Sequence, residues 1–150
     1  MTPLITGPFR QGGGTISPDG RWLAYKSDET GQFEIYIQPG PGGKIPVSIG
    51  GGTQPAWSHD SSELFYRDND GMMVAATIFD DAARPVGDRT PLFPAALYRL
   101  GTGFRQYHVA PDGRFLMQRL AGQSTVDGGE APHINVVLNW FEELRERVPD

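Results

Sequence analysis

The chain has 150 residues, with 18 acidic and 13 basic side chains and a formal net charge of -5. This length fits one domain, and the mild acidity argues against the clustered positive charge of nucleic-acid-binding proteins. The chain contains no cysteine, which excludes disulfides and thiol chemistry, and no apolar run approaches the length of a membrane span.

A tight turn followed by a short strand occurs three times along the chain. The three copies read ISPDGRWLAY at residues 16–25, WSHDSSELFY at residues 57–66 and VAPDGRFLM at residues 109–117. Proline, aspartate and glycine suit the successive corners of such a turn. Copies spaced by about forty to fifty residues, with room for four short strands each, predict propeller blades. The alternative is an ordinary antiparallel sandwich whose turns resemble one another by chance.

The N-terminal residues 2–6 predict an outer strand that belongs to a blade formed elsewhere in the chain or its partner. Blade one, about residues 15–49, has expected strands at residues 15–17, 22–27, 33–38 and 44–49. Its third strand alternates in character: Phe33, Ile35 and Ile37 share one face, and Glu34, Tyr36 and Gln38 share the other. That period of two is typical of a strand.

Blade two, about residues 54–93, follows a run of three glycines. Its expected strands lie at residues 54–57, 63–67, 72–78 and 88–93, and the Asp-Gly pair at residues 70–71 favours a hairpin between the second and third.

Blade three, about residues 105–139, has expected strands at residues 105–109, 114–120 and 134–139. A short amphipathic helix is predicted at residues 140–148 in place of a fourth strand. Asn139 suits its N-cap, and Glu142 is placed to complete a capping box.

Three blades are too few to close a propeller, which has four to eight blades. The sequence therefore predicts an all-β partial propeller of one domain, residues 1–150, that a homodimer completes to six blades. In that ring residues 2–6 of each copy would complete blade three of the other. The alternative is that the chain is a fragment of a longer protein.

The repeats resemble the WD-like and TolB-like propeller repeats of bacteria, on the residues 16–25, 34–37 and 51–58. The run INVVLNWFEEL at residues 134–144 is similar to the end of propellers attached to bacterial serine/threonine protein kinases. The sequence departs from the family pattern at His59, at Ser61-Ser62 and at His108. The resemblance implies a binding or sensor role, periplasmic or extracytoplasmic if the chain belongs to a longer protein. As written, without a signal peptide, the chain is expected in the cytoplasm and away from the membrane.

A group of polar residues is expected at the mouth of the channel, because loops there lead into the inner strands. Phe-Arg-Gln occurs twice, at residues 9–11 and 104–106, and arginine suits carboxylate or phosphate ligands. The first hypothesis is therefore a propeller module that binds a small anionic ligand or a protein without its own catalysis; solvated loop charge is the alternative. The candidate binding residues are Arg10, Gln11, Gln54, Arg105, Gln106 and Tyr107.

The three histidines, His59, His108 and His133, support a second hypothesis. Three imidazoles can bind zinc or another divalent metal and leave a position for a water that ionises near neutral pH. Such a site would make the chain a small, promiscuous hydrolase of esters or phosphotriesters. Blade topology separates the three within one chain, so the candidate site is the channel of the dimer, where copies of His108 would meet. Asp19, Asp60 and Asp112 occupy turn positions and are expected to have structural roles.

Overall fold

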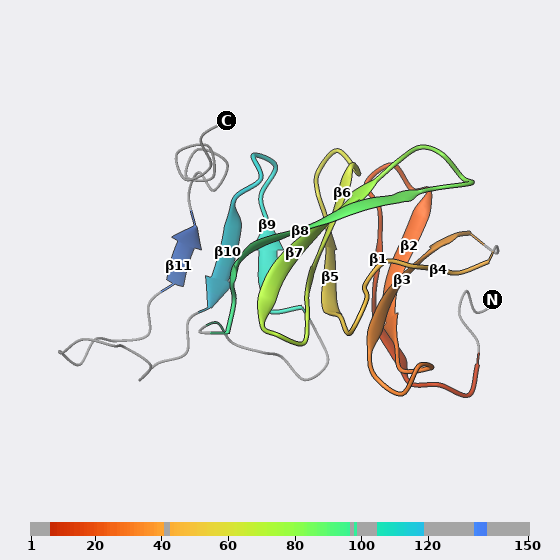
Figure 1. The fold of residues 1–150 in the computed structure, drawn as a ribbon. Coiled ribbons are helices and arrows are strands. Elements are labelled where there is room, and N and C mark those ends of the chain that lie inside the picture. Colours follow the sequence, from red (N-terminus) through yellow and green to blue (C-terminus); the bar gives the residue numbers. More distant parts are fainter. Residues whose placement is uncertain (1–6, 41–42, 97, 99–104, 119–133, 138–150) are drawn as a thin grey trace.

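A computed structural model describes residues 7–40, 43–96, 98, 105–118 and 134–137 of the chain. Within these residues the fold is all-β, and the strands form three antiparallel sheets that stand side by side (Figure 1). The sheets correspond to the three predicted blades. The predicted N-terminal strand at residues 2–6 and the helix at residues 140–148 lie outside the described residues. No helix in the described ranges is long and apolar enough to cross a bilayer.

The first blade has the strand order β1-β2-β3-β4. Its strands are β1 (Gln11–Ile16), β2 (Trp22–Ser27), β3 (Glu34–Pro39) and β4 (Ile45–Pro46). The bounds of β2 match the prediction. β1 begins earlier than the expected Thr15, because Gly13 takes a positive φ of 67° and the strand continues through a bulge. β4 is shorter than expected because the N–H groups of Val47 and Ser48 both turn toward the Ile35 carbonyl oxygen, at 2.7 and 3.3 Å.

Both faces of β3 are buried, although its sequence alternates between apolar and polar residues. On the polar face the ring of Tyr36 stacks on Tyr25, with centroids 5.9 Å apart. The carboxylate of Glu34 accepts hydrogen bonds from the Ser48 hydroxyl and, at 2.8 Å, from the side-chain amide of Gln32. The alternation therefore identifies the strand correctly, but it does not mark a solvent-facing side.

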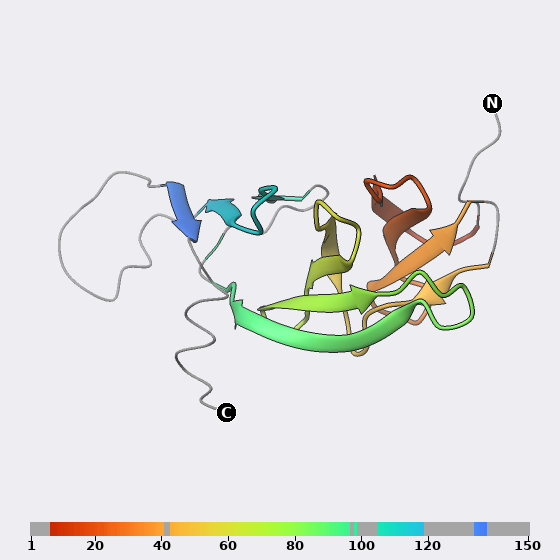
Figure 2. The same ribbon diagram turned by 90° about the horizontal axis from the view of Figure 1, so that it is seen from above.

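The second blade has the order β5-β6-β7-β8. Its strands are β5 (Thr53–Trp57), β6 (Glu63–Arg67), β7 (Met72–Ile78) and β8 (Val86–Pro94). β6 and β7 match the prediction, whereas β8 is longer than expected and curves along the outside of the blade (Figure 2). The Arg89 guanidinium of β8 donates a hydrogen bond to the Val47 carbonyl oxygen, so this strand ties blade two to blade one.

The third blade has the order β11-β10-β9 within the described residues. Its strands are β9 (Tyr107–Val109), β10 (Phe115–Gln118) and β11 (Ile134–Val137). All three lie inside the predicted ranges; residues 119–120 and 138–139, where the second and third predicted strands end, lie outside the described residues.

The repeated turn is closed differently in blade three. The N–H groups of Ser17 and Ser58 donate to the carbonyl oxygens of Trp22 and Glu63, at 2.8 and 3.0 Å. Each serine hydroxyl also accepts the N–H of that same partner, at 2.9 Å. Ala110 has no hydroxyl, and its N–H instead donates to the Arg114 carbonyl oxygen at 2.8 Å, one residue earlier in the motif.

This shorter turn decides which face of β10 meets blade two. A shift of one residue in a strand moves every side chain to the opposite face. In blade three Val109 pairs with Phe115 and His108 pairs with Leu116. Phe115 therefore points toward blade two, and Leu116 points away from it.

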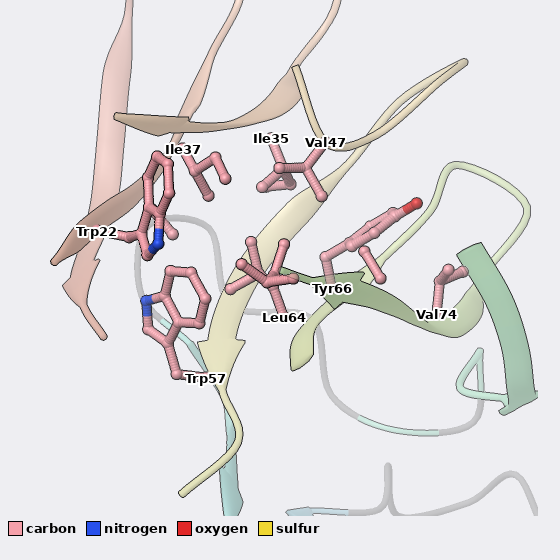
Figure 3. Packing of buried hydrophobic residues seen from close by; sticks show 11 residues of the cluster. Trp22, Ile35, Ile37, Val47, Trp57, Leu64, Tyr66 and Val74 are labelled. Atoms are coloured by element: carbon pink, nitrogen blue, oxygen red, sulfur yellow. The ribbon is translucent and has the colours of Figure 1, made fainter. Parts of the chain in front are cut away.

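Two apolar clusters join the blades. The first lies between blades one and two, where Trp22 and Trp57 approach each other beside Leu64 (Figure 3). The second lies between blades two and three, where the Phe115 ring contacts Phe65 edge-on with centroids 4.9 Å apart. Blade two thus buries both of its faces, which is the arrangement that repeat proteins need for stability.

Candidate functional site

A hollow of about 370 Å³ lies along the start of β9 and the end of β10 in blade three. We call it the β9–β10 hollow. Three of the six predicted binding residues line it, together with one of the predicted metal ligands. Its lining residues are Arg105, Gln106, Tyr107, His108, Leu116, Met117 and Gln118.

Tyr107 anchors this site to the neighbouring blade. Its side chain is 5% exposed, and its hydroxyl donates to the carbonyl oxygen of Gln54 at 2.7 Å, with that of Phe65 at 3.3 Å. Burial raises the pKa of the Tyr107 hydroxyl, so the side chain stays neutral and acts as a hydrogen-bond donor. Tyr107 packs toward blade two and therefore positions the start of β9, which lines the hollow.

Arg105 places a cation close to the Tyr107 ring. Its guanidinium carbon lies 6.0 Å from the centre of the Tyr107 ring, and its side chain is exposed. Gln106 and His108 follow on the same strand segment, and Leu116 adds an apolar group opposite His108. No carboxylate occurs among the described lining residues. The hollow is thus suited to an anion that also has an apolar part.

The other three predicted binding residues do not line this hollow. Arg10 forms an ion pair with Asp28, with Nε and Oδ2 2.7 Å apart, and its backbone N–H donates to the same carboxylate at 2.8 Å. These contacts lower the pKa of Asp28. Gln11 begins β1 and pairs with Ser27, in blade one. Gln54 is buried, and its main contribution to the site is the carbonyl oxygen that accepts the Tyr107 hydroxyl.

A second hollow, of about 310 Å³, lies between the repeated turns of blades two and three. We call it the turn hollow. Its lining residues are Ser58, His59, Asp60, Glu63, Phe65, Val109, Ala110, Pro111, Asp112 and Gly113. Burial raises the pKa of Glu63, and the neighbouring Asp60 charge adds to this shift. Its carboxylates give this hollow the opposite electrostatic character to the β9–β10 hollow.

The histidines are separated in the structure. His59 lines the turn hollow, His108 lines the β9–β10 hollow, and His133 lies outside the described residues. Within the described ranges no three histidine, aspartate or glutamate side chains come together as metal ligands.

The turn aspartates have the structural role that their positions predict. Asp19 accepts the Ser17 hydroxyl at 2.5 Å and the Arg21 Nε–H at 2.7 Å. The hydrogen bond from Ser17 is the main reason that the pKa of Asp19 falls to about 2. Asp60 accepts the hydroxyls of Ser58 and Ser62, which lower its pKa as well.

Three lining residues of the β9–β10 hollow were not among the predicted site residues: Leu116, Met117 and Gln118. Their positions depend on the pairing register of β9 and β10. The missing hydroxyl at Ala110 was the signal in the sequence that could have indicated a shorter turn and this register.

Comparison with known proteins gives a likeness in fold. Neither a family model nor a curated protein matches the chain. Among solved structures, an oligogalacturonate lyase from Vibrio parahaemolyticus matches with a TM-score of 0.56 and 13% identity, over 77% of this chain and 31% of the lyase. A TolB-type protein from Agrobacterium tumefaciens matches with a TM-score of 0.53 and 18% identity, over 81% of this chain and 42% of that protein.

Both of these proteins are β-propellers, and the chain spans less than half the length of each. At these identities the likeness concerns the fold alone. With three blade-like sheets in the expected order, it shows that the chain has the fold of a partial β-propeller.

Proposed function

We propose that the chain is a propeller binding module that holds a small organic anion in the β9–β10 hollow and has no catalysis of its own. The observation that carries the proposal is the grouping of Arg105, Gln106 and His108 around one hollow whose described lining contains no carboxylate. A guanidinium can bind a carboxylate through two parallel hydrogen bonds. Leu116, which is 43% exposed, would contact the apolar part of the ligand.

A nuclear magnetic resonance titration with benzoate tests this proposal, because benzoate combines a carboxylate with a flat apolar body. Benzamide is the matched neutral probe. We expect benzoate to shift the backbone amide signals of residues 105–108 and 116–118, and benzamide to shift them far less. Equal shifts with both probes, or none with benzoate, would overturn an anion site.

A pair of variants assigns the binding to the arginine. We expect Arg105→Gln to weaken benzoate binding about tenfold, the loss typical of one charge-assisted contact. Arg84→Gln removes the same charge from an exposed position in the loop between β7 and β8, outside the hollow. It should leave benzoate affinity unchanged. Equal effects of the two substitutions would mean that net charge, and not the hollow, attracts the anion.

The absence of catalysis is tested separately. Chelator-sensitive hydrolysis of an activated ester or phosphotriester, lost in His108→Ala, would overturn the proposal in favour of the metal-dependent hydrolase. If neither the natural chain nor the His108→Ala variant hydrolyses these substrates, the binding role stands.

A further inference from the structure

The backbone hydrogen bonds of the repeated turn define equivalent positions in the three blades. Trp22, Glu63 and Arg114 each close the turn through their carbonyl oxygen. The residues that directly follow these three therefore occupy equivalent positions in the three blades, and so do the residues two positions after them. The first set is Leu23, Leu64 and Phe115; the second set is Ala24, Phe65 and Leu116.

At both internal interfaces, a residue of the second set meets a residue of the first set from the following blade. Ala24 of blade one lies in the same buried cluster as Leu64 of blade two. Phe65 of blade two contacts Phe115 of blade three with ring centroids 4.9 Å apart. The propeller thus repeats one interface between blades. In each blade, the residue of the first set faces the preceding blade and the residue of the second set faces the following blade.

The two end blades each leave part of one half of this interface exposed within the described residues, although Tyr25 and Tyr36, further along this face of blade one, are buried. On blade three Leu116 is 43% exposed. On blade one Leu23 is only half-buried, and Ile16 beside it is 60% exposed. The equivalent of Ile16 in blade two is Trp57, which pairs with Leu64 and is 7% exposed because it packs against blade one.

We propose that a second copy of this chain covers both open faces, with blade three of each copy packed against blade one of the other. Leu116 of one copy would then meet Leu23 of the second copy, as Phe65 meets Phe115 inside the chain. A second copy presents the Leu23 face that blade three lacks and the Leu116 face that blade one lacks, in the same orientation as at the two internal interfaces. Two such contacts close a ring of six blades, within the range of four to eight.

This assembly would also complete the proposed binding site, and in this respect the inference rests on the proposed function. Two residues that line the β9–β10 hollow, His108 and Leu116, lie on the open face of blade three. Inside the chain, successive inner strands lie side by side, β1 beside β5 and β5 beside β9. In the ring, β1 of the second copy would lie beside β9. It would bring Arg10 and Gln11 to the hollow that holds Arg105 and Gln106, uniting the two Phe-Arg-Gln segments.

Engineered cysteines test the assembly, because the natural chain contains none. We expect a light-scattering mass of twice 16.4 kDa for the natural chain. A mixture of Leu23→Cys and Leu116→Cys chains should form a disulfide-linked heterodimer under mild oxidation. A mixture of Leu23→Cys with Phe79→Cys is the control, since Phe79 is similarly exposed but lies after β7, away from both end faces. A monomeric mass, or equal linking in the control mixture, would overturn the second copy as the occupant.

The substitution Ile16→Asp distinguishes a failure of this inference from a failure of the proposed function. Ile16 is exposed and outside the hollow, so the change should produce a folded monomer that binds benzoate more weakly than the natural chain does. A monomer with unchanged benzoate affinity would overturn the shared site and leave the binding function in place. A dimer that links through cysteines 23 and 116 but ignores benzoate would support the assembly and overturn the proposed function.

Discussion

The hydroxyl of Tyr107 donates a 2.7 Å hydrogen bond to the backbone carbonyl oxygen of Gln54, which joins the inner strands of blades two and three. Tyr107 belongs to the segment of β9 that lines the β9–β10 hollow, beside His108. One buried side chain therefore connects the stability of the blade interface to the geometry of the candidate site.

Removing that hydroxyl should destabilise the protein. In Tyr107→Phe the carbonyl oxygen of Gln54 would stay buried without this donor, which costs about 1 to 3 kcal/mol in the free energy of unfolding. Urea denaturation measures the loss. Tyr25→Phe is the comparison, because it keeps the stacking on Tyr36 and should change stability less. A Tyr107→Phe protein as stable as the natural one would show that water satisfies the carbonyl.

Arg67 should be required for the connection between blades two and three. Its side chain is 2% exposed, and its guanidinium donates to the carbonyl oxygen of Ala95 and lies 3.4 Å from that of Tyr98. Burial lowers the pKa of Arg67, but the group remains a cation at neutral pH. Arg67→Met would remove the guanidinium donor and leave the Ala95 carbonyl oxygen with only the Tyr98 N–H, 3.1 Å away.

We expect Arg67→Met to lower the free energy of unfolding by about 1 to 3 kcal/mol. Arg67→Lys should recover only part of this loss, because an ammonium lacks the planar fork of a guanidinium. Thermal unfolding of the three proteins side by side gives the order. If Arg67→Lys restored the whole free energy of unfolding, then the positive charge alone, without the fork geometry, would hold the carbonyl oxygens of Ala95 and Tyr98.

The turn of blade one should respond to acid through Asp19. Its pKa lies at about 2 in the folded chain, against an ordinary value of 3.8, mainly because the Ser17 hydroxyl donates to it. A lowered folded pKa means that Asp19 contributes stability above about pH 4, and that this contribution is lost as the pH falls toward 2.

Carbon-13 titration of the carboxyl signals in Ser17→Ala measures this effect. The pKa of Asp19 should rise toward its ordinary value, while that of Asp60 stays lowered by Ser58 and Ser62. If Asp19 still titrates near pH 2 without the Ser17 hydroxyl, then Arg21 and not Ser17 is the main cause.

Gly52 is closely packed against the outer strands of the first blade, and a substitution there tests this packing. A Cβ atom at this position would lie 2.8 Å from side-chain atoms of both Ile35 and Ser48. We expect Gly52→Ala to destabilise the chain by about 1 to 3 kcal/mol, as overpacking of a core does. At Gly43 the same added atom would meet nothing within 4 Å, so Gly43→Ala should be close to neutral. Equal stability of the two variants would contradict the packing seen at β3.

Much of the architecture could be predicted from the sequence because its turn residues act locally. The bounds of β2, β6 and β7 agree with prediction, and each is followed or preceded by a turn with an evident cause. Gly20 and Gly71, for example, take positive φ values of 76° and 81°, which glycine adopts without strain.

The candidate site was harder to predict because it depends on a register. The letters of the motif align Phe115 with Trp22, but the backbone hydrogen bonds align Phe115 with Leu23. Where the two turns diverge, Ser17 has a hydroxyl oxygen that accepts the Trp22 N–H, and Ala110 has none. A pattern of apolar and polar letters predicts a strand but does not tell which of its faces is buried, and the same limit applies to the polar face of β3.

The burial of blade two on both faces sets an order for local opening. Within the described residues each of its neighbours contributes to only one of the two clusters, so they can separate from it one at a time, whereas β6 and β7 lose protection only when both clusters are lost. The amides of the central blade should therefore exchange with deuterated solvent last, and a protease should cut the end blades before it reaches the middle one.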